Sequence, residues 1–208
     1  MSKIPAYYHK LLEQNFSLFD QKVLSILLEI SDFQKLSAKT RFLDFGYTDR
    51  KAFYLIEGYI TGILRDAAEK EYNIMLRGPN SFNINVEHLL GSNKAIYAFE
   101  TITDSKILMF DFAEFEKIAL SKKKFNTLYV NILKQNMIIM QNRIEESLTK
   151  NPEQRYVSLL QKSPELFQQA FNKQIAKYLG ITPVSLSRIR KRVYHNHPEL
   201  TLNTRLSQ

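Results

Sequence analysis

A short turn between two helices, at residues 180–183, restricts the fold of this chain more than any other sequence feature. Gly180 can adopt the left-handed conformation that ends a helix, and Thr182 is a good N-cap residue for the next one. Pro183 then fits the first helical position, where its missing N–H costs nothing. Two helices joined by so short a turn must cross steeply, so the pattern predicts a helix-turn-helix over about residues 172–193.

The second of these helices has one apolar face and one polar face. At about 100° per residue, Leu186, Ile189 and Val193 cluster within about one sixth of the circumference and are expected to face the core. The predicted DNA-binding face on the other side consists of Val184, Ser185, Ser187, Arg188, Lys191 and Arg192. Arg188 lies at its centre and is predicted to bind a base edge, because a guanidinium can pair bidentately with guanine.

The residues that flank Arg188 suit the DNA backbone rather than the bases. Ser185, Lys191 and Arg192 are predicted to contact phosphates. Arg190 lies beside the apolar stripe and is poorly aimed for bases. The alternative interpretation of the whole face is a solvated basic helix.

Net charge is distributed unevenly along the chain. Residues 151–208 contain 9 Lys and Arg against 3 Asp and Glu, so they carry most of the total net charge of +8. A basic C-terminal module on a nearly neutral body indicates a polyanionic partner such as double-stranded DNA. A merely solubilising surface would give the same charge.

From residue 40 to about 111 the sequence consists of short runs rich in aromatic and β-branched residues, separated by turn residues. The predicted strands are 41–45, 52–57, 59–65, 72–77, 95–103 and 106–112. Their regular spacing predicts a sandwich or a roll. The preceding stretch, up to about Ile30, has apolar residues at helical intervals and is predicted to be helical.

A long helix is predicted from about residue 126 to 148, a stretch without glycine or proline. One apolar stripe has the heptad spacing of a helix that pairs with a second copy. This predicted dimer interface consists of Val130, Leu133, Met137, Met140 and Ile144. A second stripe, Leu128, Ile132 and Ile139, is expected to pack on the β domain of the same chain. Burial of the heptad stripe within a single chain is the alternative.

The residues that metal, redox or covalent catalysis would need are scarce. The sequence has no cysteine, which excludes disulfides, thiolate metal sites and iron–sulfur clusters. Double-stranded β folds also host metal-dependent oxygenases, but those sites need several converging histidine and carboxylate ligands. Only His88, of four histidines, lies in the β region, and we expect it at the surface. With no Gly-rich phosphate loop or nucleophile motif either, neither a metal site nor an enzyme is predicted.

The arrangement as a whole resembles the Crp/Fnr superfamily of bacterial transcription regulators. The motif that carries the resemblance is Ile175-Ala-Lys-Tyr-Leu-Gly-Ile-Thr-Pro-Val-Ser-Leu-Ser-Arg-Ile-Arg-Lys191, with Arg188 at the family's base-contacting arginine. The segment Tyr54-Leu-Ile-Glu-Gly58 is similar, less specifically, to a strand and glycine turn of the family's roll. Val184 stands where many members carry an acidic residue, so we expect an unusual operator, with Val184 against a thymine methyl group.

The resemblance implies an α+β fold in three parts. An N-terminal double-stranded β-helix, the cyclic-nucleotide-binding-like β-roll, is expected over residues 1–125. A dimerisation helix and hinge are expected over residues 126–150, with Pro152 marking the boundary. A winged helix-turn-helix domain is expected over residues 151–208. The implied function is a homodimeric, sequence-specific DNA-binding regulator in the cytoplasm, with RNA polymerase as a candidate partner. No run of about 18 apolar residues occurs, so no membrane partner is predicted.

The family's cyclic-nucleotide cassette pairs a Gly-Glu dipeptide with a later arginine, and this sequence has neither in that form. In the corresponding segment Glu87 follows a valine, and the late cation is Lys94, which lacks the planar fork that suits a phosphate. Glu87 and Lys94 are therefore the candidate ligand-pocket residues, and we expect no dependence on cyclic AMP. The alternatives are a cyclic-nucleotide-responsive regulator with a degenerate pocket, or a cyclic-nucleotide module attached to another effector. No cofactor is predicted, and the effector is unknown.

Overall fold

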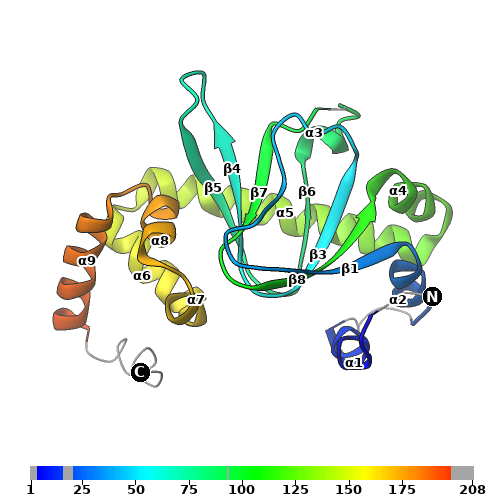
Figure 1. Cartoon of the computed structure of the whole chain (residues 1–208), viewed down its shortest axis with the longest axis horizontal. Coiled ribbons are helices and arrows are strands. Elements are labelled where there is room, and N and C mark those ends of the chain that lie inside the picture. The colour runs from blue at the N-terminus through cyan, green and yellow to red at the C-terminus, as the bar shows by residue number, and fades with distance from the viewer. Residues whose placement is uncertain (1–3, 16–20, 93, 198–208) are drawn as a thin grey trace.

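The computed structural model describes residues 4–15, 21–92 and 94–197, with a β-roll at the centre of the molecule (Figure 1). The roll consists of two four-stranded antiparallel sheets, of strand order β1-β8-β3-β6 and β2-β7-β4-β5. The strands are β1 (Ser31–Leu36), β2 (Arg41–Leu43), β3 (Lys51–Glu57), β4 (Ile60–Arg65), β5 (Glu71–Arg77), β6 (Ser81–Ile84), β7 (Tyr97–Thr101) and β8 (Ser105–Asp111). All six predicted strands are confirmed, with shifted ends.

The central strand β3 is buried on both faces, which explains its almost continuous apolar sequence. Phe53 and Leu55 point between the two sheets, where they meet side chains such as Phe99 of β7. Tyr54 and Ile56 point the other way, into a core that helices complete. The roll is thus held by one core between its sheets and another on the outer face of the first sheet.

Helices cover that outer face at the end of the roll opposite the C-terminal helices (Figure 1). They are α1 (Ala6–Asn15), α2 (Gln21–Glu29), α4 (Phe112–Ser121) and the first half of α5 (Lys123–Thr149). The opening stretch is helical as predicted, with residues 16–20 outside the described part. Leu12, Leu27 and Phe115 are almost completely buried there.

Two strands and one short helix of the roll were not among the predicted elements. β1 and β6 are the edge strands of the first sheet, and α3 (Val86–Leu89) follows β6. Edge strands are exposed on one side and carry polar residues, as in the Ser-Asp-Phe-Gln-Lys-Leu of β1. Their sequences therefore lack the β-branched and aromatic run that identified the inner strands.

The long helix α5 begins slightly earlier than predicted and changes surroundings along its length. Phe125, Leu128 and Ile132 in its first half are buried against the roll. Its second half runs on towards the C-terminal helices (Figure 1). Ile139 is 40% exposed there, so the predicted packing of the second stripe on the roll is wrong beyond Ile132. Ile139 instead lines a cavity between α5 and β5.

Four further helices form the C-terminal unit. They are α6 (Pro152–Lys162), α7 (Pro164–Gln169), α8 (Asn172–Leu179) and α9 (Pro183–Asn196). Asn151 and Gln154 form a capping box that starts α6, directly after the break at the end of α5. Tyr59 and Ile102 of the roll join the apolar core of these helices. The predicted wing would follow α9 and lies outside the described residues.

Candidate nucleic-acid interface

The turn between α8 and α9 has the geometry that its sequence predicts. Gly180 ends α8 in the left-handed conformation, with φ of 70°. The N–H of Ile181 donates to the carbonyl of Ala176 at 3.0 Å and closes the turn. The Oγ1 of Thr182 accepts from the N–H of Ser185 at 3.1 Å, and Pro183 opens α9. These local bonds fix the direction of α9 relative to α8.

One side of α9 is anchored in the core of the C-terminal unit. Leu186, Ile189 and Val193 are 1%, 5% and 0% exposed. They pack with Ile175 and Leu179 of α8, the residues that form the apolar face of that helix. Burial of this stripe sets the rotation of α9 about its own axis, so the predicted orientation of the helix is confirmed.

The opposite side of α9 faces away from the core. Val184 is 62% exposed, Ser185 is half-buried, and the remaining predicted residues Ser187, Arg188, Lys191 and Arg192 are exposed. Within the described part of the chain, the guanidinium of Arg188 and the ammonium of Lys191 have no hydrogen-bond or ion-pair partner. The face therefore presents cations and small polar groups at helical spacing, which is what phosphates and base edges require.

Two other arginines of α9 are held by the protein. Arg190 donates from Nη1 to Oδ1 of Asn172 at 2.8 Å and from Nη2 to the hydroxyl of Tyr194 at 3.2 Å. This fits its predicted place beside the apolar stripe. Arg192 forms an ion pair with Glu153 at the start of α6, with Nη2 2.7 Å from Oε2. Glu153 lies beside the predicted face, and no sequence pattern marked it as a neighbour of Arg192.

Contacts between the roll and α8 hold the C-terminal unit in place. Lys177 of α8 lies 3.4 Å from Glu71 at the start of β5. Glu71 also accepts from Arg41 at 2.9 Å and from Arg65 at 3.2 Å. Hydrogen bonds from Arg41 above all, together with Arg65 and nearby charges, lower the pKa of Glu71 to about 2. The carboxylate stays ionised at any physiological pH and ties the two parts together.

Comparison with solved structures identifies this architecture. The regulator CLP of Xanthomonas campestris, described as c-di-GMP responsive, matches with a TM-score of 0.67, 16% identity and coverage of 85% of this chain and 93% of its own. FixK2 of Bradyrhizobium japonicum matches with a TM-score of 0.69, 12% identity and coverage of 80% and 86%. A Crp/Fnr-family transcriptional regulator of Thermus thermophilus matches with a TM-score of 0.60, 17% identity and coverage of 85% and 100%.

The chain has the Crp/Fnr fold. The fold predicted from the helix-turn-helix motif and the strand pattern is therefore confirmed. No family model matches the sequence, and no curated protein sequence matches it either. The similarity to the three structures is one of fold, at sequence identities of 12% to 17%.

In this Crp/Fnr fold, the segment that corresponds to the nucleotide cassette is closed by its own hydrogen bonds. Asn85, 1% exposed, donates to the carbonyl of Tyr97 at 3.0 Å and accepts from the N–H of Tyr97 at 3.3 Å. Glu87 lies half-buried on α3, and its Oε2 has no hydrogen-bond partner. Lys94 is exposed, and no described interaction joins it to Glu87. The structure thus shows no pocket formed by these two residues together.

The one histidine of the roll does not lie at the surface as expected. His88 is 0% exposed and packs against the ring of Tyr47, with 5.6 Å between ring centroids. Burial lowers its pKa, so the imidazole is neutral at physiological pH. Within the described residues no group of three or more histidine, aspartate or glutamate side chains could hold a metal ion. No described helix is long and apolar enough to cross a membrane.

The heptad stripe of α5 is left largely uncovered by its own chain. Met137, Met140 and Ile144 are 71%, 43% and 59% exposed, and Val130 is 37% exposed. Leu133, on the half of α5 that packs on the roll, is half-buried. So many large apolar side chains along one face are unusual for a helix that stays in water alone.

Proposed function

We propose that this protein is a sequence-specific DNA-binding transcription regulator of the Crp/Fnr type that acts as a homodimer. The observation that carries the proposal is the outer face of α9, where Arg188 and Lys191 have no partner in the described chain while Leu186, Ile189 and Val193 fix the helix below. Such a helix, presented at the end of a compact unit, fits the major groove of B-DNA. The basic charge of residues 151–208 supplies the attraction to phosphates.

The heptad stripe of α5 is the proposed dimer interface. A second copy would cover Met137, Met140 and Ile144, which the chain itself leaves in water. The dimer would present two copies of α9 to two half-sites of an operator. In this proposal residues 1–125 form the roll domain, 126–150 the dimerisation helix and hinge, and 151–208 the DNA-binding domain.

The proposed regulator works without cyclic AMP. Two observations support this: the Asn85–Tyr97 hydrogen bonds that join α3 to β7, and the exposed position of Lys94. The second, cyclic-nucleotide-responsive interpretation would need an arginine or a Gly-Glu pair that the segment lacks.

Selection of DNA bound from a random pool, followed by fluorescence anisotropy, tests the function. We expect enrichment of a two-fold symmetric site and a dimer by light scattering at micromolar concentration. The double substitution Met137→Lys with Met140→Glu should separate the chains, because unpaired charges buried in the interface cost several kcal/mol each, by order of magnitude. Asn131→Lys, an exposed site on the same helix outside the stripe, is the control. A monomeric wild type, or a pool without enrichment, would refute the proposal.

A further inference from the structure

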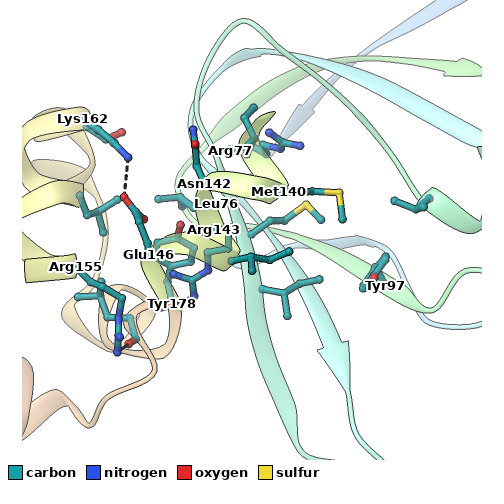
Figure 2. Close-up of a pocket in the computed structure, with 18 residues that line it drawn as sticks. Leu76, Arg77, Tyr97, Met140, Asn142, Arg143, Glu146, Arg155, Lys162 and Tyr178 are labelled. Atoms are coloured by element: carbon teal, nitrogen blue, oxygen red, sulfur yellow. Dashed lines mark hydrogen bonds and ion pairs between the residues drawn. The ribbon is translucent and has the colours of Figure 1, made fainter. Parts of the chain in front are cut away.

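A cavity of about 420 Å³ lies where the roll, the second half of α5 and the C-terminal helices meet (Figure 2). Its walls come from β5, α5, α6 and α8, with contributions from Val86 and Tyr97. Neither Glu87 nor Lys94, the pocket residues expected from sequence, lines it. The volume is within the range of small-molecule sites in proteins.

Arg77, the last residue of β5, is the most unusual residue of this cavity. Its side chain is 5% exposed, its Nη2 donates to Oδ1 of Asn136, and its Nε has no partner. In the described part of the chain no carboxylate lies within ion-pairing distance of its guanidinium. Burial lowers the pKa of Arg77 to about 10, which still leaves it charged at neutral pH. A buried cation without a counter-ion is unfavourable, so the site lacks one negative charge.

Two further guanidinium groups line the cavity and bind backbone carbonyls rather than acids. Arg143 donates to the carbonyl of Tyr178 at 2.7 Å. Arg155 donates to the carbonyl of Lys150 at 2.7 Å and, less closely, to that of Leu179 at 3.2 Å. Both side chains are therefore oriented by the protein, while no carboxylate of the described residues pairs with their charges.

The carboxylate in the lining, Glu146, is already neutralised. Its Oε1 accepts from Lys162 at 2.7 Å, from Ser158 at 2.8 Å and from Lys150 at 3.2 Å. Burial by itself would raise the pKa of Glu146, yet these hydrogen bonds bring it down to about 2. Glu146 is thus engaged by two lysines, and among the lining residues no other carboxylate faces the three arginines.

The rest of the lining is apolar. It includes Met75, Ile139, Met140, Leu159 and Leu179. We propose that this cavity binds a small amphipathic organic acid, with its oxyanion paired to Arg77 and its apolar body against the methionine and leucine side chains. A planar guanidinium is well suited to a carboxylate or a phosphate.

A second copy of the chain is the competing occupant, since Met140 and Ile144 belong both to the cavity lining and to the heptad stripe. A coiled-coil partner would bring apolar side chains to that stripe and would not need three arginines behind it. The cationic lining therefore favours a small anion that remains bound beneath the partner helix. An occupant would contact the roll and the helices α6 and α8 together, which would couple its binding to the DNA-binding unit if the proposed function holds.

Isothermal titration calorimetry on the full chain tests the site, with decanoate as probe and 1-decanol as its uncharged match. No DNA is present, so failure here is separable from failure of the proposed function. We expect decanoate to bind at least tenfold more tightly than decanol and inorganic phosphate alone to bind weakly. Arg77→Met should lower the affinity for decanoate at least tenfold and leave the affinity for decanol unchanged. Arg77→Lys should retain part of the difference in affinity between decanoate and decanol.

Lys134→Met removes an exposed cation of α5 outside the cavity and should change neither titration. Thermal unfolding of Arg77→Met should show a melting temperature no lower than that of the wild type, because the substitution removes a buried unpaired charge. Equal affinities for decanoate and decanol would overturn the proposal. An unchanged affinity for decanoate in Arg77→Met would also overturn it. The same holds for a stable dimer that binds no decanoate because the second copy fills the cavity.

Discussion

The outer face of α9 and the segment from α3 to β7 are the two places where a ligand was expected, and they differ in how their polar groups are used. On α9 the guanidinium of Arg188 points into solvent and has no partner in the described chain. Between α3 and β7 the buried amide of Asn85 satisfies both backbone groups of Tyr97. The first surface still has hydrogen bonds to offer, whereas Asn85 and the backbone of Tyr97 in the second have already formed theirs with each other.

This difference teaches that position in a fold does not by itself make a binding site. A polar group that is exposed and unpaired can bind a ligand at little cost, because only water must leave. A buried group that is already paired must first break a hydrogen bond, and leaving its partner unsatisfied costs about 1–3 kcal/mol. The Crp/Fnr fold supplies both places, and the side chains decide which of them can bind.

The strongest test of the comparison is Arg188→Ala. Because a bidentate contact to a base carries sequence information, we expect a loss of about 1–3 kcal/mol on the selected operator and little change on a scrambled duplex. Fluorescence anisotropy on both duplexes measures this. Arg190→Ala, which removes an arginine that the protein itself holds, should relax specificity less. Equal losses on the two duplexes for Arg188→Ala would show that the base-contacting face lies elsewhere.

The hydrogen bonds that close the segment from α3 to β7 can be tested with Asn85→Ala. Removal of two buried hydrogen bonds should lower the free energy of unfolding by about 1–2 kcal/mol. Urea denaturation followed by circular dichroism gives this value, and Asn131→Ala on the exposed side of α5 serves as control. If Asn85→Ala unfolds at the same urea concentration as the wild type, the segment is not held closed by this side chain.

A smaller effect should come from the ion pair between Arg192 and Glu153. This pair is intermediate between the unpaired Arg188 and the buried, paired Asn85, because it is both exposed and paired. Arg192→Ala should weaken binding to all duplexes alike and flatten the salt dependence of log affinity by about one unit, since one phosphate contact is lost. Glu153→Gln should act in the opposite direction by up to about 1 kcal/mol, because an exposed pair is worth no more than that. Glu114→Gln, on α4, is the control for loss of one negative charge. Tighter binding in Glu114→Gln as well would point to net charge rather than to this pair.

The smallest expected effect is that of cyclic AMP, which should neither bind appreciably nor alter operator affinity. The backbone N–H of Tyr97 is already paired with Asn85, and Lys94 lies in solvent. Calorimetry with cyclic AMP decides this. A micromolar dissociation constant, equivalent to a binding free energy of about −8 kcal/mol, would show that the segment from α3 to β7 does bind a cyclic nucleotide.

Several features of this protein follow from local sequence alone, because short-range bonds produce them. The Gly180 turn and the Thr182 cap depend on residues within one helical turn, and the burial of Leu186, Ile189 and Val193 follows from helical periodicity. The inner strands were likewise marked by their apolar composition. These elements were sufficient to predict the Crp/Fnr fold, and the position of every predicted α9 residue on its exposed or half-buried side.

Tertiary structure decided what depends on contacts between distant segments. The edge strands β1 and β6 owe their conformation to pairing with β8 and β3, and their own sequences are too polar to show it. The burial of His88, the Glu153–Arg192 pair and the Asn85–Tyr97 bonds join elements whose proximity no local pattern encodes. The cavity around Arg77 belongs to the same class, because residues from several distant elements must converge before a buried cation can be recognised as lacking its counter-ion.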